Sequence, residues 1–400
     1  MKARDWIWIV LAATAGGGLG AWLVSRNTEP PPPAPPPRVE PDPEPEVRGH
    51  REPVYMLRTE KPTVSPAGVE MRWAKMNREA IDALEKGDAK HAVDLFTQCL
   101  DAVPSEKVFA ANLAEALARL SLAEYERGGD DDRKHSLEHL TRAAELAPAR
   151  TDIKQRKEQL ERLLASEKDL WTESSEHFEL SYDGERSDLK WSSYEITHVL
   201  EYAYQEFGEM FGRHPVENGR PKIKVVVYKR DSFHEATGIG HWAGGLYDGT
   251  IRVPLENLRG EKQELVRVLR HETAHAFVAE LAGKSVPGWI NEGLAQWLES
   301  STLMMRAREV QAARKKLAGK ELLPLERLQK NLGDRKDAGE IGLAYAEALA
   351  FTAFIEHAYG ERVLFEMVAG CATSTPCETT FKARTGVELS QALSDLAAEL

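Results

Sequence analysis

The spacing of apolar and polar residues divides most of the chain into two regions. Over 70–168 the apolar positions recur every three to four residues, which is typical of amphipathic helices. Beyond this region apolar residues alternate over 178–182, as in a half-buried strand, and recur at helical spacing over 189–211. We therefore expect an all-helical region followed by a region of mixed helices and strands.

The second region contains further predicted elements. A strand is expected over 223–227, and the Asp-Gly turn within 245–253 predicts a β-hairpin. The second arm of this hairpin is expected at a sheet edge, where it either binds an extended substrate by strand addition or is an ordinary hairpin arm. A helix over 262–281 is apolar nearly all round and should be buried. Later helices are predicted over 303–317, 341–359 and 361–368.

The N-terminus carries a long apolar run between polar residues. As a helix, residues 6–24 would be roughly 28 Å long, close to the ~30 Å hydrocarbon core of a bilayer. We expect an uncleaved single-pass transmembrane anchor over 1–26, with Lys2 and Arg4 in the cytoplasm and the body of the chain periplasmic or extracellular. The alternative is a cleaved signal peptide, because the Ala-Thr-Ala segment at 13–15 resembles a cleavage site.

Proline and acidic residues dominate 30–46. Proline holds the backbone extended at about 3.1 Å per residue, so this segment is suited to keep the body at a distance from a membrane. We assign residues 27–69 to a proline-rich spacer and linker.

The helical region contains an internal similarity at an offset of about 44 residues. The corresponding positions of the two copies are Ala92 and Ser136, Phe96 and Leu140, Cys99 and Ala143, and Pro104 and Pro148. This pattern resembles tetratricopeptide repeats, with an expanded turn expected at 128–132. The resemblance implies stacked helices over 70–168, which either offer a groove to a protein partner or only pack against the next domain.

Composition narrows the classes of function. A hydrophobic share of 42% fits a globular body, and a net charge of -12 argues against a nucleic-acid-binding surface, which needs clustered Lys and Arg. Three cysteines are too few for a disulfide framework. Cys99 is expected to be buried as a small apolar residue, and Cys371 and Cys377 either form a disulfide or remain free thiols.

Potential metal ligands lie on the helix predicted over 262–281. His271 and His275 are one helical turn apart, so both imidazoles can face one ion, and Glu292 follows after a short turn. Neutral imidazole suits zinc, and three protein ligands leave a fourth position open at a catalytic site. The sequence predicts a site for one Zn²⁺ ion. The alternative, two histidines that merely share a helix face, leaves the downstream carboxylate unexplained.

The segment His-Glu-Thr-Ala-His at 271–275, with Trp-Ile-Asn-Glu-Gly-Leu-Ala at 289–295, resembles the gluzincin metallopeptidases. The arrangement of an anchor, helical repeats and a compact catalytic unit resembles the peptidase MA-like domain proteins. These resemblances imply an α+β, zincin-like domain over 169–400, with a small mixed sheet and active-site helices. They also imply a protein or peptide substrate, Glu272 as the general base, and Tyr345 as hydrogen-bond donor to the oxyanion; a packing role is the alternative for Tyr345.

Two departures from these relatives narrow the expected activity. The Gly-x-Met-Glu-Asn segment of related aminopeptidases has no match, since 244–248 is Gly-Gly-Leu-Tyr-Asp, which favours an endopeptidase. Gln296 stands where thermolysin-like enzymes carry an Asp that hydrogen-bonds a zinc histidine. A neutral Gln can still orient an imidazole, though without raising its basicity as a carboxylate would. His234, His241 and Tyr247 are expected to be loop or rim residues.

The sequence therefore predicts a membrane-anchored, extracytoplasmic zinc endopeptidase. The alternative from another class is a scaffold with weak or no turnover, whose helical repeats bind protein partners.

Overall fold

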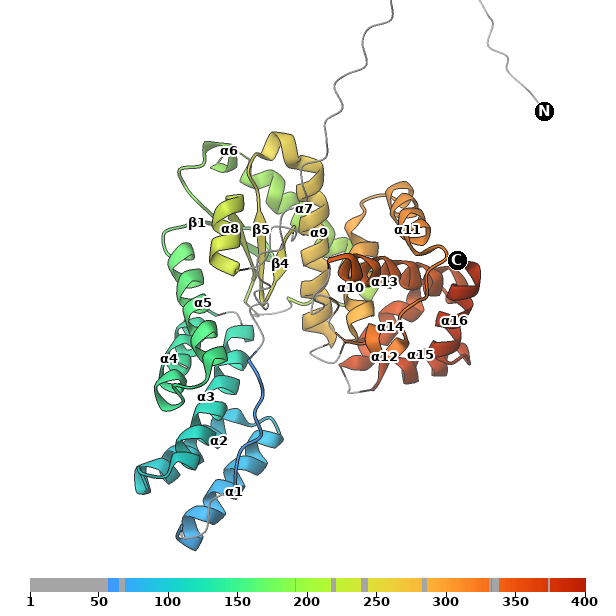
Figure 1. The fold of residues 1–400 in the computed structure, drawn as a ribbon. Coiled ribbons are helices and arrows are strands. Elements are labelled where there is room, and N and C mark those ends of the chain that lie inside the picture. The colour runs from blue at the N-terminus through green and yellow to red at the C-terminus, as the bar shows by residue number, and fades with distance from the viewer. Residues whose placement is uncertain are drawn as a thin grey trace, which may run out of the picture. The chain divides into compact units, whose positions relative to one another are not determined.

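The computed structural model describes residues 57–64, 69–127, 129–190, 192–216, 221–238, 244–282, 286–330, 332, 338–372 and 375–400. These residues form sixteen helices and one sheet of five strands (Figure 1). About 70% of them are helical.

The expected fold class, α+β with a single N-terminal transmembrane helix, needs correction. Helices dominate the described residues because the repeats and the C-terminal helices bury most of their apolar faces against one another. The predicted anchor over 1–26 lies outside the described residues, as does most of the predicted spacer. Within the described ranges no helix is long and apolar enough to cross a membrane, so the structure does not support this part of the prediction.

The N-terminal region is a run of five helices in which each packs on the next. They are α1 (Met71–Glu85), α2 (Ala89–Ala102), α3 (Lys107–Arg127), α4 (Asp130–Leu146) and α5 (Thr151–Glu167). Six of the paired repeat positions are fully buried, namely Ala92, Phe96, Cys99, Ser136, Leu140 and Ala143. The turn expected at 128–132 is not expanded, because α4 already begins at Asp130; the 21 residues of α3 take up the longer period.

The sheet is mixed, with strand order β1-β2-β3-β5-β4. Its strands are β1 (Trp171–Ser174), β2 (Phe178–Tyr182), β3 (Ile223–Tyr228), β4 (Leu246–Tyr247) and β5 (Thr250–Pro254). β2, β3 and β5 run parallel, and the outer strands β1 and β4 pair antiparallel to their neighbours. The predicted hairpin is formed by β4 and β5, but its first arm is at the edge. The second arm, β5, is internal because it also pairs with β3.

The two faces of the sheet pack against different apolar cores, because side chains alternate along a strand. Val225 and Val227 of β3 belong to a core with α7 and α9. Val226 and Tyr228, on the opposite face, belong to a core that also contains residues of α1 to α5, such as Leu160. The core of the helical repeats therefore continues onto the sheet, and the domain boundary predicted at 168 remains a prediction.

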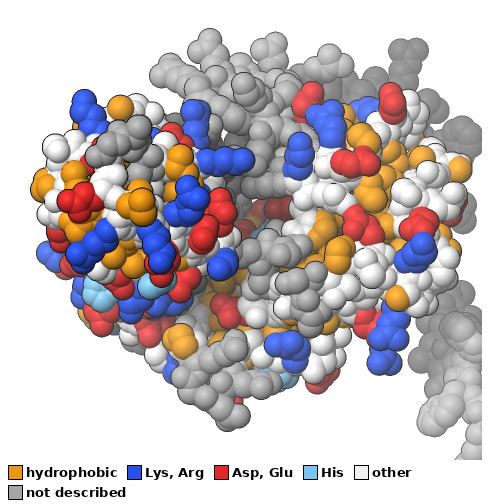
Figure 2. Space-filling view, turned by 90° about the horizontal axis from the view of Figure 1, so that it is seen from below, with side chains coloured by type: hydrophobic (Ala, Val, Ile, Leu, Met, Phe, Trp, Pro, Cys, Tyr) orange, Lys and Arg blue, Asp and Glu red, His pale blue; other side chains and the backbone are white. Residues whose placement is uncertain are grey.

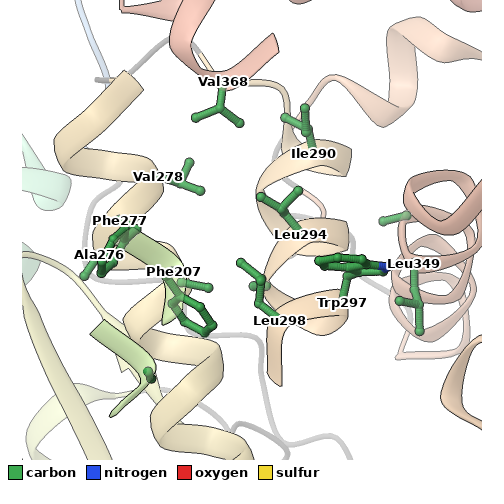
Figure 3. Packing of buried hydrophobic residues seen from close by; sticks show 14 of the residues in the cluster. Phe207, Ala276, Phe277, Val278, Ile290, Leu294, Trp297, Leu298, Leu349 and Val368 are labelled. Carbon is green, nitrogen blue, oxygen red and sulfur yellow. The ribbon is translucent and has the colours of Figure 1, made fainter. Parts of the chain in front are cut away.

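The remaining helices surround or follow the sheet. They are α6 (Ser187–Lys190), α7 (Ser193–Phe211), α8 (Arg230–Thr237), α9 (Leu258–Ala282), α10 (Gly288–Glu299), α11 (Leu303–Leu317), α12 (Leu325–Leu328), α13 (Ala338–Tyr359), α14 (Glu361–Cys371), α15 (Cys377–Thr385) and α16 (Leu389–Glu399). Cys371 and Cys377 are joined by a disulfide, and Cys99 is buried as predicted. Helix α10 lies between α9 and α13, with Leu294 directed toward α9 and Trp297 toward Leu349 of α13 (Figure 3).

Charged side chains of both signs are interspersed on the face shown in Figure 2, where Lys and Arg lie among Asp and Glu. Several exposed side chains form ion pairs, such as Lys262 with Glu195 and Arg314 with Glu399. Pairs as exposed as these contribute only about 0–1 kcal/mol each. The stability of the fold therefore depends mainly on its two apolar cores.

Candidate metal centre

Helix α9 is held in place by a buried arginine directly before the first histidine. The Arg270 guanidinium pairs with Glu206 of α7 at 2.8 Å and donates to the Leu298 carbonyl oxygen of α10 at 3.1 Å. It also lies over the ring of Phe207. A buried guanidinium that joins three helices sets the rotation of α9, and with it the direction of His271.

Helix α10 approaches α13 closely where the third predicted ligand is located. Gly293, next to Glu292, lies so near the backbone of Ala348 and the side chain of Thr352 that a Cβ atom would collide with both. Only glycine allows this approach without a shift of one helix. The glycine therefore helps to bring Glu292 to the face of α10 that meets α9.

The ligand atoms of His271, His275 and Glu292 all lie within 4.8 Å of one another. The two Nε2 atoms are 3.2 Å apart, and the Glu292 Oε2 atom lies 3.9 Å from His271 Nε2 and 3.6 Å from His275 Nε2. A single point therefore lies about 2.1 Å from all three atoms, which is the ligand distance of zinc. The donor set and its spacing both fit a zinc ion.

In each histidine the other ring nitrogen, Nδ1, donates a hydrogen bond to a side-chain oxygen of α10. His271 Nδ1 donates to Glu299 Oε2 at 2.7 Å, and His275 Nδ1 donates to Asn291 Oδ1 at 3.1 Å. These bonds favour the tautomer in which both Nε2 lone pairs face the shared point. Two lone pairs and a carboxylate repel one another at these distances, so the arrangement calls for a cation or a proton between them.

Glu299 is in turn held by an arginine on the preceding turn of α9. Arg267 Nη1 donates to Glu299 Oε1 at 3.0 Å, so the carboxylate bridges a guanidinium and an imidazole. By contrast, Glu272 and Glu292 form no ion pair with Lys or Arg in the described part of the chain. The centre has excess negative charge, which favours a divalent cation.

The orienting role expected of Gln296 is wrong. Its Nε2 atom donates to the Glu292 carbonyl oxygen at 3.2 Å and to the Tyr345 carbonyl oxygen at 3.0 Å, so it joins α10 to α13. The residue that orients His271 is Glu299, two helical turns after Glu292 and therefore on the same face of α10. This spacing was a signal in the sequence, as was the position of Asn291 next to the ligand.

Glu272 is buried beneath the segment that leads into β4. A Cβ atom on Gly245 would lie 2.6 Å from Glu272 Oε1 and 2.8 Å from Val268. Burial raises the pKa of Glu272 above its ordinary value, against the opposing effect of His271 and His275. A carboxyl group with a raised pKa is a stronger base than a solvated one, as a general base near neutral pH requires.

The charges of the ligands also affect one another. Burial alone would lower the pKa of His275, but the carboxylates of Glu292 and Glu272 raise it to about 9. Burial would raise the pKa of Glu292, and His275 and His271 instead hold it below 4.5. A metal ion would therefore compete with a proton for this site.

Of the other candidate residues, Tyr345 contacts the centre, and the loop or rim position expected for His234 is wrong. The Tyr345 hydroxyl hydrogen-bonds Glu292, so it contacts a predicted ligand directly. Tyr247 is half-buried on β4, beside α9, and the pKa of its hydroxyl is raised chiefly by burial. His234 is buried on α8 and packs against Phe233. His241 lies outside the described residues.

Comparison of the sequence with protein-family profiles and with curated proteins finds no match. The chemistry of this centre is therefore inferred from its own residues.

Proposed function

We propose that this chain is a zinc-dependent endopeptidase of the gluzincin type that hydrolyses peptide bonds in protein or peptide substrates. The observation that carries the proposal is the convergence of two imidazoles and one carboxylate on a point at zinc-ligand distance. The three side chains remain 13–16% exposed, so that a substrate group can reach this point.

His271, His275 and Glu292 would hold the ion. When bound, zinc supplies a Lewis acid that polarises a carbonyl group and makes a water molecule acidic enough to react near neutral pH. Glu299 and Asn291 keep the imidazoles in the ligating tautomer, and Glu299 adds negative charge behind His271.

Glu272 is the general base in this proposal. It follows His271 on the same buried helix, and burial favours its protonated form, so it can accept a proton from the attacking water and pass it to the leaving amine. The Tyr345 hydroxyl lies at the Glu292 carboxylate, where it can also donate to a developing oxyanion.

The edge strand β4 suggests how a polypeptide would bind. In the described residues β4 pairs only with β5, so it is an edge strand of the sheet. The segment before it lies against Glu272. An extended substrate added to this edge would pass near the general base, which favours a protein or peptide substrate over a small molecule.

The decisive experiment compares wild-type protein with Glu272→Gln after loading with zinc. Metal analysis should find one zinc ion per chain in both proteins, while cleavage of a denatured protein mixture should fall by about 10²–10⁴-fold in the variant. Glu309→Gln, an exposed carboxylate on α11, is the matched control and should cleave like wild type. Full cleavage by Glu272→Gln would contradict the proposed base, and zinc-loaded wild type without cleavage would favour the scaffold alternative.

A further inference from the structure

A buried polar network joins the helical repeats to the β4–β5 hairpin. The Tyr125 hydroxyl of α3 donates to Asp248 Oδ2 in the hairpin turn at 2.5 Å. Arg252 of β5 pairs with the same Asp248 and, at 2.9 Å, with Glu167 at the end of α5. Glu167 also pairs with Arg133 of α4 at 3.0 Å. Three repeat helices thus supply partners to one hairpin.

The network is enclosed rather than on the surface. Arg252 is fully buried, Arg133 is 4% exposed, and Thr250, which accepts from Arg133, is also fully buried. The Tyr228 hydroxyl of β3 donates to Glu167 at 2.6 Å. Two guanidinium groups face two carboxylates, so most of the charge is compensated within the network.

The repeat helices also pack around the network. Arg156 of α5 lies 4.6 Å above the Tyr125 ring, and Leu246 of β4 belongs to the same apolar core as Leu160 of α5. Arg252 and Thr250 point to this side of the sheet, and Ile251 between them points into the other core. The position of the hairpin therefore depends on α3, α4 and α5.

The other end of the same hairpin lies at the proposed active site. Gly245, one residue before β4, is in contact with Glu272, and Asp248 directly follows β4. Only the two residues of β4 lie between Gly245, which contacts the general base, and Asp248 of the network. A shift of the turn would move β4 and the segment that covers Glu272.

We propose that the helical repeats complete the substrate site, with Tyr125 and Glu167 as positioning residues that hold the edge strand β4 against the active-site helix. This inference rests on the proposed peptidase function. It makes α3 to α5 part of the catalytic unit rather than a separate recruitment module.

The test uses the zinc-loaded full chain and the substitution Tyr125→Phe, which removes one hydroxyl and keeps the ring. We expect zinc content to be unchanged and KM for a long peptide that reaches β4 to rise about tenfold, because misplaced binding groups weaken productive binding. The kcat value and the cleavage of a short peptide with the same scissile bond should change by less than about twofold. Tyr202→Phe, an exposed tyrosine on α7, is the control.

Hydrogen exchange supplies a readout that does not need cleavage. In Tyr125→Phe the amides of β4 and β5 should exchange about tenfold faster while those around His271 and His275 are unchanged. In the double variant Tyr125→Phe with Asp248→Asn, the amides of β4 and β5 should exchange no faster than in Asp248→Asn alone, because the hydroxyl acts through that carboxylate. Faster exchange confined to α3–α5, or none at all, would overturn the inference. If wild type cleaves nothing, the proposed function fails, and exchange still decides the positioning role.

Discussion

Two buried charged clusters lie on either side of the β4–β5 hairpin, and they differ in how their carboxylates are paired. In the network around Arg252, the carboxylates of Glu167 and Asp248 are paired with guanidinium groups. In the centre around His271, the carboxylates of Glu272 and Glu292 pair with no Lys or Arg of the described residues, and three ligand atoms lie within 4.8 Å of one another.

This difference separates a cluster that joins elements from one that can bind an ion. A buried carboxylate needs a compensating positive charge. The network contains that charge in its own side chains. Among the described residues the centre lacks this charge, apart from Arg267 behind Glu299, so a proton or a metal ion would supply it. Substitutions in the network should therefore lower the stability of the fold, whereas substitutions in the centre should lower metal affinity.

The largest expected effect is on stability and falls on the network. Glu167→Gln removes the negative charge that Arg133 and Arg252 share and should lower the free energy of unfolding by about 3–5 kcal/mol, measured by urea denaturation. Glu161→Gln, an exposed residue on the same helix that pairs with Lys157, should cost less than about 1 kcal/mol. Equal losses for both variants would mean that the network does not join the repeats to the sheet.

A smaller effect is expected on metal affinity at the centre. Glu299→Gln weakens the acceptor for His271 Nδ1 and should lower zinc affinity by about 10–100-fold in a chelator competition. The control is Gln296→Ala, because Gln296 contacts carbonyl oxygens rather than a ligand imidazole. If Gln296→Ala weakens zinc binding more than Glu299→Gln does, the assignment of the orienting residue is wrong.

The smallest effect concerns acid stability. Burial alone would raise the pKa of Glu167, but Arg252 and Arg133 hold it below 4.5. The folded state therefore holds this proton less tightly than the unfolded state, and the stabilisation is complete above the unfolded pKa and lost as pH falls through the folded pKa. The stability difference between wild type and Glu167→Gln should be constant from about pH 6 to 8 and shrink below 4.5. Urea denaturation over this range measures it, and a difference independent of pH would contradict the pairing.

Much of the candidate metal centre could be anticipated because its spacing is local. One helical turn separates His271 from His275 on α9, and Glu292 lies near the start of the next helix, α10. Glu299 was missed because the expected orienting residue was placed by analogy, four residues after Glu292. The true partner is seven residues after it, a spacing that α10 also places on the ligand face.

Helices and strands were predicted well where apolar residues recur at a regular spacing within one element. The helix expected over 303–317 is α11, and the strand over 178–182 is β2. The network was not predicted, since Tyr125 and Asp248 are 123 positions apart and no periodicity relates them. The edge position of β4 was also missed, because strand order depends on the pairing of β5 with β3, which is a tertiary contact.

The most direct test of the central claim is a zinc titration of the purified full chain, followed by metal analysis, for wild type and His275→Ala. Wild type should retain one zinc ion per chain after dialysis, and His275→Ala should retain none under the same conditions while keeping a wild-type helical circular dichroism spectrum. Wild type without stoichiometric zinc, or His275→Ala that retains it, would contradict a metal centre formed by His271, His275 and Glu292.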